Sequence, residues 1–152
     1  METIHTAREV RVSWSSEPIR DGAVVVGRDR IGDVGTFEDL RERFPGARVR
    51  SWPGVLGPAR VHEGPLPAAP TPRERVHEVL KLGAVVVLEE HAGTPELRAA
   101  AERNGVVVWP SAPSPVGEPC IRRTGRADLA VFDDTGACVA TVCAGRLVHR
   151  RR

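Results

Sequence analysis

The sequence contains no tyrosine, only 4% aromatic residues and a single methionine. Basic residues outnumber acidic ones by only 22 to 20, and the densest basic run is the short segment 149–152. Nucleic-acid binding requires a basic face and usually aromatic or base-reading groups. A nucleic-acid partner is therefore not expected.

Cysteine is also scarce, and Cys120, Cys138 and Cys143 form no C-x-x-C pair. Their odd number argues against a disulfide framework or a thiolate zinc site, so we expect reduced thiols. Cys138 and Cys143 fall in predicted strands and should be small core residues. Arg122 and Arg123 could lower the pKa of the Cys120 thiol, but without a positioned base an inert thiol is the expectation.

Long apolar runs are absent as well, since no stretch approaches the roughly 20 residues that cross a bilayer. Residues 1–10 lack the apolar core of a secretory signal, and no glycine-rich phosphate-binding signature occurs. With 152 residues, 41% hydrophobic and 28% charged, the chain suits one globular domain. We expect a soluble cytoplasmic protein with no membrane partner.

Both ends of the chain have the pattern of β structure. Short apolar runs separated by Gly, Asp and Pro predict strands over 4–12, 22–26, 30–34, 47–52, 128–132, 138–144 and 146–149. Thr36 as an N-cap predicts a short amphipathic helix over 37–44. Neither end has enough strands to bury a face alone, so the two ends should pack on each other.

The middle of the chain has a different pattern. Six prolines between Pro53 and Pro72 predict a loop or linker, and a second proline-rich loop is predicted over 110–119. Between these loops the pattern predicts helices over 73–82 and 94–104 and strands over 84–88 and 106–109. A strand, helix, strand order with short connections predicts a right-handed crossover and a parallel pair.

Two motifs carry a family resemblance. Residues 18–35, with the run Ile19-Arg20-Asp21-Gly22-Ala23-Val24-Val25-Val26, are similar to the opening strands of amidohydrolases of the imidazolonepropionase, guanine deaminase and aminodeoxyfutalosine deaminase type. Residues 125–146, with the run Gly125-Arg126-Ala127-Asp128 (G-x-A-D) and a V-x-x-G-R pattern, resemble the closing strands of the same family. The resemblance covers residues 10–56 and 121–149.

This resemblance implies a fold of the α+β class. In the family the two ends form a β-sandwich, the composite domain, beside a catalytic barrel. We therefore expect residues 1–56 and 120–152 to form a composite β-sandwich. Residues 57–119 would form proline-rich loops and a small α/β insert of two helices and two parallel strands.

The catalytic barrel itself has no room in this chain. A (β/α)₈ barrel takes about 250 residues, and the segment 57–120 is about a quarter of that length. The family uses a His-x-His pair and an Asp that acts as ligand and base. At best His62 remains of the pair, and no Asp occurs between Asp39 and Asp128.

A hydrolytic metal site needs about three protein ligands and an open position for water. The possible ligands in the central segment are His62, Glu63, His77, Glu89, Glu90, His91 and Cys120. The best set is His62, His91 and Glu90, because His91 and Glu90 follow a predicted strand, where α/β proteins place their sites. Against this, Glu89-Glu90-His91 is ordinary loop composition, and adjacent side chains do not all point one way.

The leading hypothesis is a degenerate, non-catalytic amidohydrolase-like domain that needs no cofactor and acts through binding or association. A sandwich face that lacks its barrel should be covered by the insert, by a second copy in a homodimer, or by a partner such as a complete amidohydrolase relative. The alternative is a hydrolase of non-peptide C–N bonds that uses zinc or iron. A third reading is a small-molecule or nucleotide binder with its site between sandwich and insert. We expect Trp14, Trp52 and Trp109 to pack rather than to bind a ligand.

Overall fold

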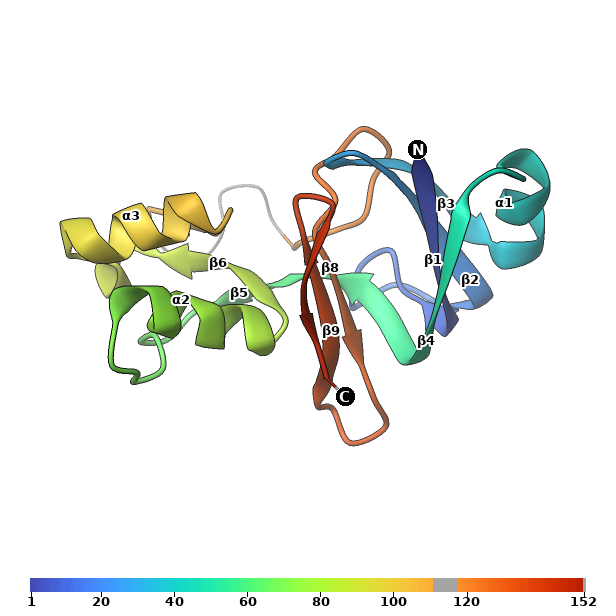
Figure 1. Ribbon diagram of the computed structural model, residues 1–152. Helices are drawn as coiled ribbons and strands as arrows, with labels where there is room; N and C mark the ends of the chain where they lie inside the picture. The colour runs from blue at the N-terminus through green and yellow to red at the C-terminus, as the bar shows by residue number, and fades with distance from the viewer. Residues whose placement is uncertain (111–117, 152) are drawn as a thin grey trace.

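The computed structural model describes residues 1–110 and 118–151, so most of the loop predicted over 110–119 lies outside the described residues. The expected α+β class is confirmed. Figure 1 shows a large sheet at the centre, a smaller sheet with two helices on one side, and a short helix on the other.

The large sheet has seven strands, in the order β10-β9-β8-β4-β1-β2-β3. Their bounds are β1 (Glu2–Val10), β2 (Ile19–Gly27), β3 (Arg30–Thr36), β4 (Arg48–Pro58), β8 (Leu129–Phe132), β9 (Cys138–Cys143) and β10 (Arg146–Arg150). Strand β4 pairs in parallel with β1 and antiparallel with β8. The two ends of the chain thus share one sheet through β4.

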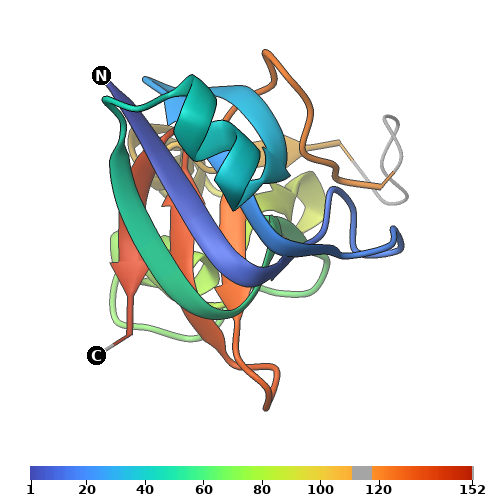
Figure 2. The ribbon, with the colours of Figure 1, turned by 90° about the vertical axis from the view of Figure 1, so that its right-hand side faces the viewer.

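This sheet folds over on itself instead of dividing into two separate sheets (Figure 2). The start of β3 reaches the segment before β8, where the Ile31 amide donates to Gly125 O (2.8 Å) and the Thr124 amide donates to Ile31 O (2.9 Å). Side chains from both halves fill the space between them, among them Val24, Leu56 and Val131. The sandwich-like core is therefore enclosed by one curled sheet.

The expectation of a loop from Pro53 onward was wrong. Strand β4 continues to Pro58, and β5 (Arg60–His62) follows directly. Pro53 is tolerated because the register of β4 against β1 shifts there, from Ala7 opposite Trp52 to Glu9 opposite Val55. A proline without an amide proton fits such a bulge, where one residue is left out of the ladder.

The three α-helices begin as their sequences predict. They are α1 (Phe37–Arg43), α2 (Pro72–Lys81) and α3 (Pro95–Arg103). Their N-caps are Thr36, Thr71 and Thr94, and each threonine side chain accepts a hydrogen bond from a backbone amide of the first turn. A threonine cap satisfies one of the unpaired amides of the first turn. Among the described residues, none of the helices has the length and apolar character needed to cross a bilayer.

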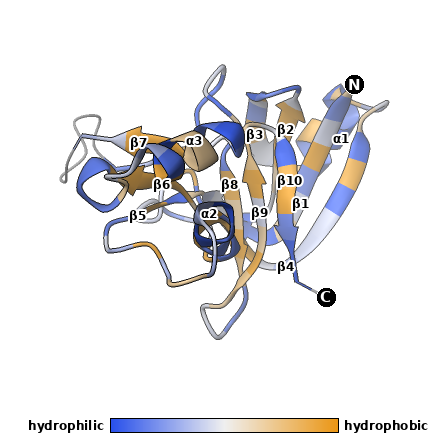
Figure 3. Cartoon of the chain, turned by 60° about the vertical axis from the view of Figure 1, so that its left-hand side comes forward, coloured by the Kyte–Doolittle hydropathy of each residue, from blue (hydrophilic) through white to orange (hydrophobic). Residues whose placement is uncertain are grey.

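The insert contains three parallel strands, one more than expected. Its sheet has the order β5-β6-β7, with β6 (Ala84–Leu88) in the middle and β7 (Val107–Trp109) at the edge. All five residues of β6 are buried, and the strand is correspondingly hydrophobic in Figure 3. The expected parallel pair is thus confirmed as β6 and β7, and β5 from the proline-rich segment completes the sheet.

A buried carboxylate also ties the two ends of the chain together. Asp33 on β3 is 3% exposed and forms ion pairs with Arg43 of α1 (2.6 Å) and Arg123 (2.9 Å). Burial raises the pKa of Asp33, but the Arg43 and Arg123 guanidiniums and the Val34 amide outweigh it and hold that pKa below its ordinary value.

One histidine in the core is held neutral. His5 on β1 is 3% exposed, and its Nδ1 accepts a 3.1 Å hydrogen bond from Trp52 Nε1 on β4. Burial, and to a smaller extent the charge of Arg50, lowers the pKa of His5 from 6.5 to about 4. In the folded protein the His5 imidazole therefore stays neutral down to about pH 4, whereas in the unfolded chain it takes up a proton below about pH 6.5.

We predict that this histidine makes the fold sensitive to mild acid. Because the folded pKa is depressed, its contribution is complete above pH 6.5 and falls away as the pH drops toward 4, by about 3 kcal/mol in all. In His5→Gln the amide oxygen still accepts from Trp52 but does not titrate. Urea unfolding at pH 7 and pH 4.5 should show a smaller loss of unfolding free energy in His5→Gln than in the natural sequence. Parallel pH profiles would contradict this account.

Candidate functional site

The insert packs directly on the outer face of the C-terminal strands. Ala130, Phe132 and Cys143 of the large sheet belong to the same core cluster as the buried residues of α2, α3 and β6. At its centre the buried Thr141 hydroxyl donates a 2.7 Å hydrogen bond to Leu80 O at the end of α2. Of the three coverings considered for this face, the insert is the one that the structure contains.

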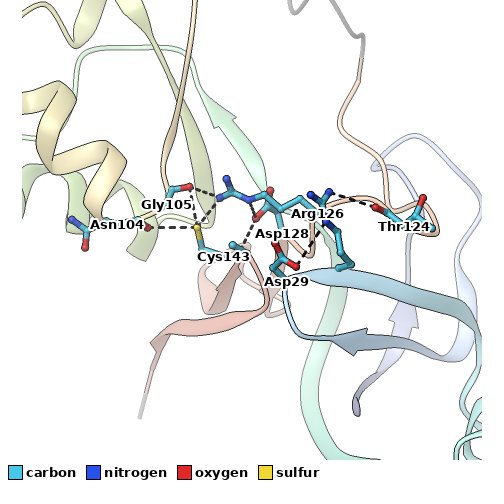
Figure 4. Close-up of polar contacts among 9 residues, drawn as sticks. Asp29, Asn104, Gly105, Thr124, Arg126, Asp128 and Cys143 are labelled. Atoms are coloured by element: carbon cyan, nitrogen blue, oxygen red, sulfur yellow. Dashed lines mark hydrogen bonds and ion pairs between the residues drawn. The ribbon is translucent and has the colours of Figure 1, made fainter. Parts of the chain in front are cut away.

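Arg126 is the main polar link between the two parts (Figure 4). Its Nε donates to Asp128 (2.9 Å), and its Nη2 donates to Cys143 Sγ (3.0 Å) and to Gly105 O in the turn between α3 and β7. Burial alone would lower the pKa of Arg126, but Asp128 and Cys143 outweigh it and raise that pKa. The guanidinium is therefore charged and held in one orientation.

An aromatic group lies on the other side of the same junction. The Arg60 guanidinium stacks 4.0 Å from the centre of the Phe132 ring and 4.9 Å from that of Trp14. Trp14 Nε1 also donates a 2.8 Å hydrogen bond to Pro58 O. A side chain at Gly57 would clash with the Trp14 ring. Trp14 thus packs, as expected, and it closes the point where β4 leaves the large sheet.

Between sheet and insert lies a hollow of about 300 Å³, here called the junction hollow. Its wall combines apolar and charged side chains with one thiol. The residues that line it are Pro58, Ala59, Val85, Val86, Trp109, Glu118, Pro119, Cys120, Arg122, Gly125, Arg126 and Asp128. Both chain ends and the insert contribute, so the hollow exists only in the folded chain.

The acidic groups of the junction hollow are already occupied by protein donors. Glu118 accepts from the Ser15 amide (3.1 Å) and the Ser15 hydroxyl (2.6 Å). One oxygen of Asp128 accepts both from Arg126 and from the Ala144 amide, the latter at 2.9 Å. These carboxylates therefore position backbone and side chains around the hollow.

The predicted metal ligands lie elsewhere. His62 ends β5, where its Nε2 is 2.9 Å from Pro65 O, whereas Glu90 and His91 lie in a single 3-10 turn (Glu89–His91) after β6. Both histidines are at the carboxyl edge of the small sheet, which was expected for His91 but not for His62, predicted to lie in a loop. Within residues 1–110 and 118–151, however, no three His, Cys, Asp or Glu side chains gather closely enough to hold a metal ion.

The remaining candidate ligands are similarly dispersed. Glu89 pairs with Arg98 of α3 at 3.3 Å, and His77 is exposed on α2. Cys120 is half-buried and lines the junction hollow. Glu63 is exposed in the segment after β5. Among the described residues, none of these side chains therefore joins His62, His91 or Glu90 in a group that could hold a metal ion.

The two motifs that carry the family resemblance have structural roles here. Asp128 of the G-x-A-D run fixes the turn between β9 and β10 by accepting from the Ala144 amide. Ala144 and Gly145 of the V-x-x-G-R pattern both have positive φ, at 49° and 79°. A side chain at Gly145 would clash with the Arg28 carbonyl oxygen, so this close approach requires glycine.

Residues 22–47 match the imidazolonepropionase-like composite domain of bacteria. The matched residues 22–47 cover most of the β2–β3 hairpin, α1 and the turn that follows, which includes part of the first motif described above. The resemblance to an amidohydrolase composite domain is thereby confirmed. No curated protein matches the chain.

Solved structures of two deaminases and an ochratoxinase have a similar fold. An adenosine deaminase from Xanthomonas campestris with bound zinc aligns with 72% of this chain and 35% of its own, at a TM-score of 0.54 and 20% identity. Guanine deaminase from E. coli aligns with 71% of this chain and 35% of its own, at a TM-score of 0.54 and 14% identity. Ochratoxinase from A. niger aligns with 71% of this chain and 30% of its own, at a TM-score of 0.52 and 16% identity. The chain spans about a third of the length of these proteins, and the likeness concerns the fold.

Sequence reasoning missed Arg126. It is the unspecified residue of the G-x-A-D run, and its partners Gly105 and Cys143 are 21 and 17 positions away in the chain. No local periodicity or motif connects residues so far apart. Only the packing of the insert on β9 brings them together.

We predict that Asp128 acts through stability. Asp128→Asn removes the charged partner of Arg126 in a partly buried site, which should lower the free energy of unfolding by about 1 to 3 kcal/mol. The matched control is Asp134→Asn, because Asp134 pairs with Arg8 on the surface at 84% side-chain exposure and should cost less than about 1 kcal/mol. Equal losses in both variants, measured by urea unfolding, would rule out this role for Asp128.

Proposed function

We propose that this protein is a non-catalytic amidohydrolase-like domain that acts by binding a small molecule in the junction hollow. The observation that carries the proposal is the position of the insert. Helix α2 packs against β9 and β10, and strands β6 and β7 line the hollow together with residues 118–128. A catalytic barrel needs eight strands around a central axis, whereas the small sheet has three in a row.

The chemistry of the central segment supports the same conclusion. No Asp occurs between Asp39 and Asp128, and Asp128 is committed to Arg126 and the β9–β10 turn. A metal-dependent hydrolase needs about three ligands at one point and a base for the bound water. The described residues offer neither arrangement.

The junction hollow has the features of a small-ligand site. Binding pockets are mostly apolar with a few fixed polar groups, and their volumes run from about 300 to 1,000 Å³. The hollow, at about 300 Å³, is at the lower end of this range. Its polar groups are held by contacts to both parts of the protein, so they are in place before a ligand enters.

Association with a second copy or with a complete relative is a different form of binding role. The large apolar side chains exposed in the described part of the chain are Met1, Val49 and Leu82. Met1 precedes β1, Val49 lies on β4 and Leu82 follows α2, and three such side chains do not make the buried apolar centre of a stable interface. The geometry therefore favours a small molecule over a protein partner.

The alternative is a metal-dependent hydrolase of non-peptide C–N bonds with zinc or iron. The observation that favours it is the shared edge of His62 and His91, both at the carboxyl ends of parallel strands. Sites of α/β proteins lie at such edges. A metal there would need a further ligand, for which Glu90 is next to His91 in sequence.

We predict that purified, untagged protein contains well below one equivalent of zinc or iron per chain. The His62→Ala, His91→Ala double variant should have the same low content, and so should the control His77→Ala, which alters a histidine outside the proposed group. Elemental analysis measures all three. About one metal per chain that is lost in the double variant but kept in His77→Ala would establish the hydrolase alternative instead.

A further inference from the structure

We propose that the ligand of the junction hollow is a small carboxylate carried on a flat apolar ring. This inference rests on the proposed binding function and names its ligand class. It follows from three features of the hollow: a guanidinium with one terminal nitrogen that has no partner among the described residues, acids that are already hydrogen-bonded, and an apolar wall.

The first feature is the bonding of Arg126. A guanidinium has five N–H donors in a planar fork. The contacts of Arg126 use Nε, toward Asp128, and Nη2, toward Cys143 and Gly105. In Figure 4 the other terminal nitrogen makes no contact with the residues drawn. Arg126 thus has donors left for a ligand.

The second feature is the balance of donors and acceptors around the hollow. Glu118 accepts two hydrogen bonds from Ser15, and Asp128 accepts two from Arg126 and Ala144. Arg122, another arginine, also lines the hollow. Arginine side chains thus line a hollow whose own carboxylates already accept hydrogen bonds from the protein. A ligand carboxylate is the group that matches guanidinium donors best.

The third feature is the apolar part of the wall. Pro58, Val85, Val86 and Pro119 present aliphatic surface, and Trp109 at the end of β7 is partly exposed. An aromatic ring of the protein next to a flat ligand ring offers offset or edge-to-face stacking. A volume of about 300 Å³ suits one ring with a short acidic substituent.

The arrangement is rigid enough to select such a ligand. Arg126 is held by residues of both parts of the protein and is 28% exposed in its side chain. A ligand therefore does not have to order this side chain, and the entropy cost of binding is reduced accordingly. A neutral ligand of the same shape would offer no charged acceptor to the remaining N–H groups of Arg126.

The test uses benzoate as the carboxylate probe and benzamide as its neutral counterpart of the same shape. Isothermal titration calorimetry of the full chain should detect benzoate binding, and benzamide should bind at least about tenfold more weakly, as expected for a lost charge-assisted hydrogen bond. Arg122→Gln and Arg126→Lys should each weaken benzoate binding by a similar factor. Arg20→Gln, which removes an exposed charge from β2, should bind benzoate like the natural sequence.

The outcomes separate this inference from the proposed function. Equal binding of benzoate and benzamide, no benzoate binding at all, or unchanged benzoate binding in both hollow variants would overturn the ligand class. Unfolding curves identify a variant that fails to fold. If Arg126→Lys fails to fold, Arg122→Gln still tests the inference, because Arg122 is at an exposed position. Benzoate binding together with stoichiometric metal lost in the histidine variant would contradict the non-catalytic role and leave the anion site intact.

Discussion

The pairing of β4 with two partners is the constraint on which the rest of the structure depends. Residues 48–58 lie in parallel with β1 on one side and antiparallel to β8 on the other. Neither chain end encloses the core alone, because Val24, Leu56 and Val131 come from both ends. Through β4 they form one sheet that curls around a common core, and the buried Asp33 fixes the closure by pairing with Arg43 and Arg123.

The same strand also decides where the insert goes. Because β4 runs to Pro58 and β5 begins at Arg60, the insert starts directly beside β8 and can cover only the face of β8 and β9. Arg126 then bridges the sheet to the turn at Gly105, and the junction hollow forms between them. A site that would be a domain boundary in a larger protein becomes the most diverse chemical environment of this chain.

Most local features could be predicted from the sequence because each has a local cause. Threonine caps, the parallel strand after α2 and the β2–β3 hairpin all depend on neighbouring residues. The loop predicted from Pro53 onward was wrong because a bulge opposite Arg8, a long-range feature, accommodates the proline within β4. His91 and Glu90 were rightly placed after a strand, but a position at the edge of a sheet does not bring side chains into a ligand group.

The sequence by itself determined the fold class, the resemblance to an amidohydrolase composite domain and the lack of room for a barrel, since these follow from periodicity, motifs and length. Only the tertiary structure decided which face is covered and what lines the hollow. The reason is that Arg126, Cys143 and Gly105 meet through packing of the insert on β9. Contacts between residues so distant in the chain leave no local pattern to read.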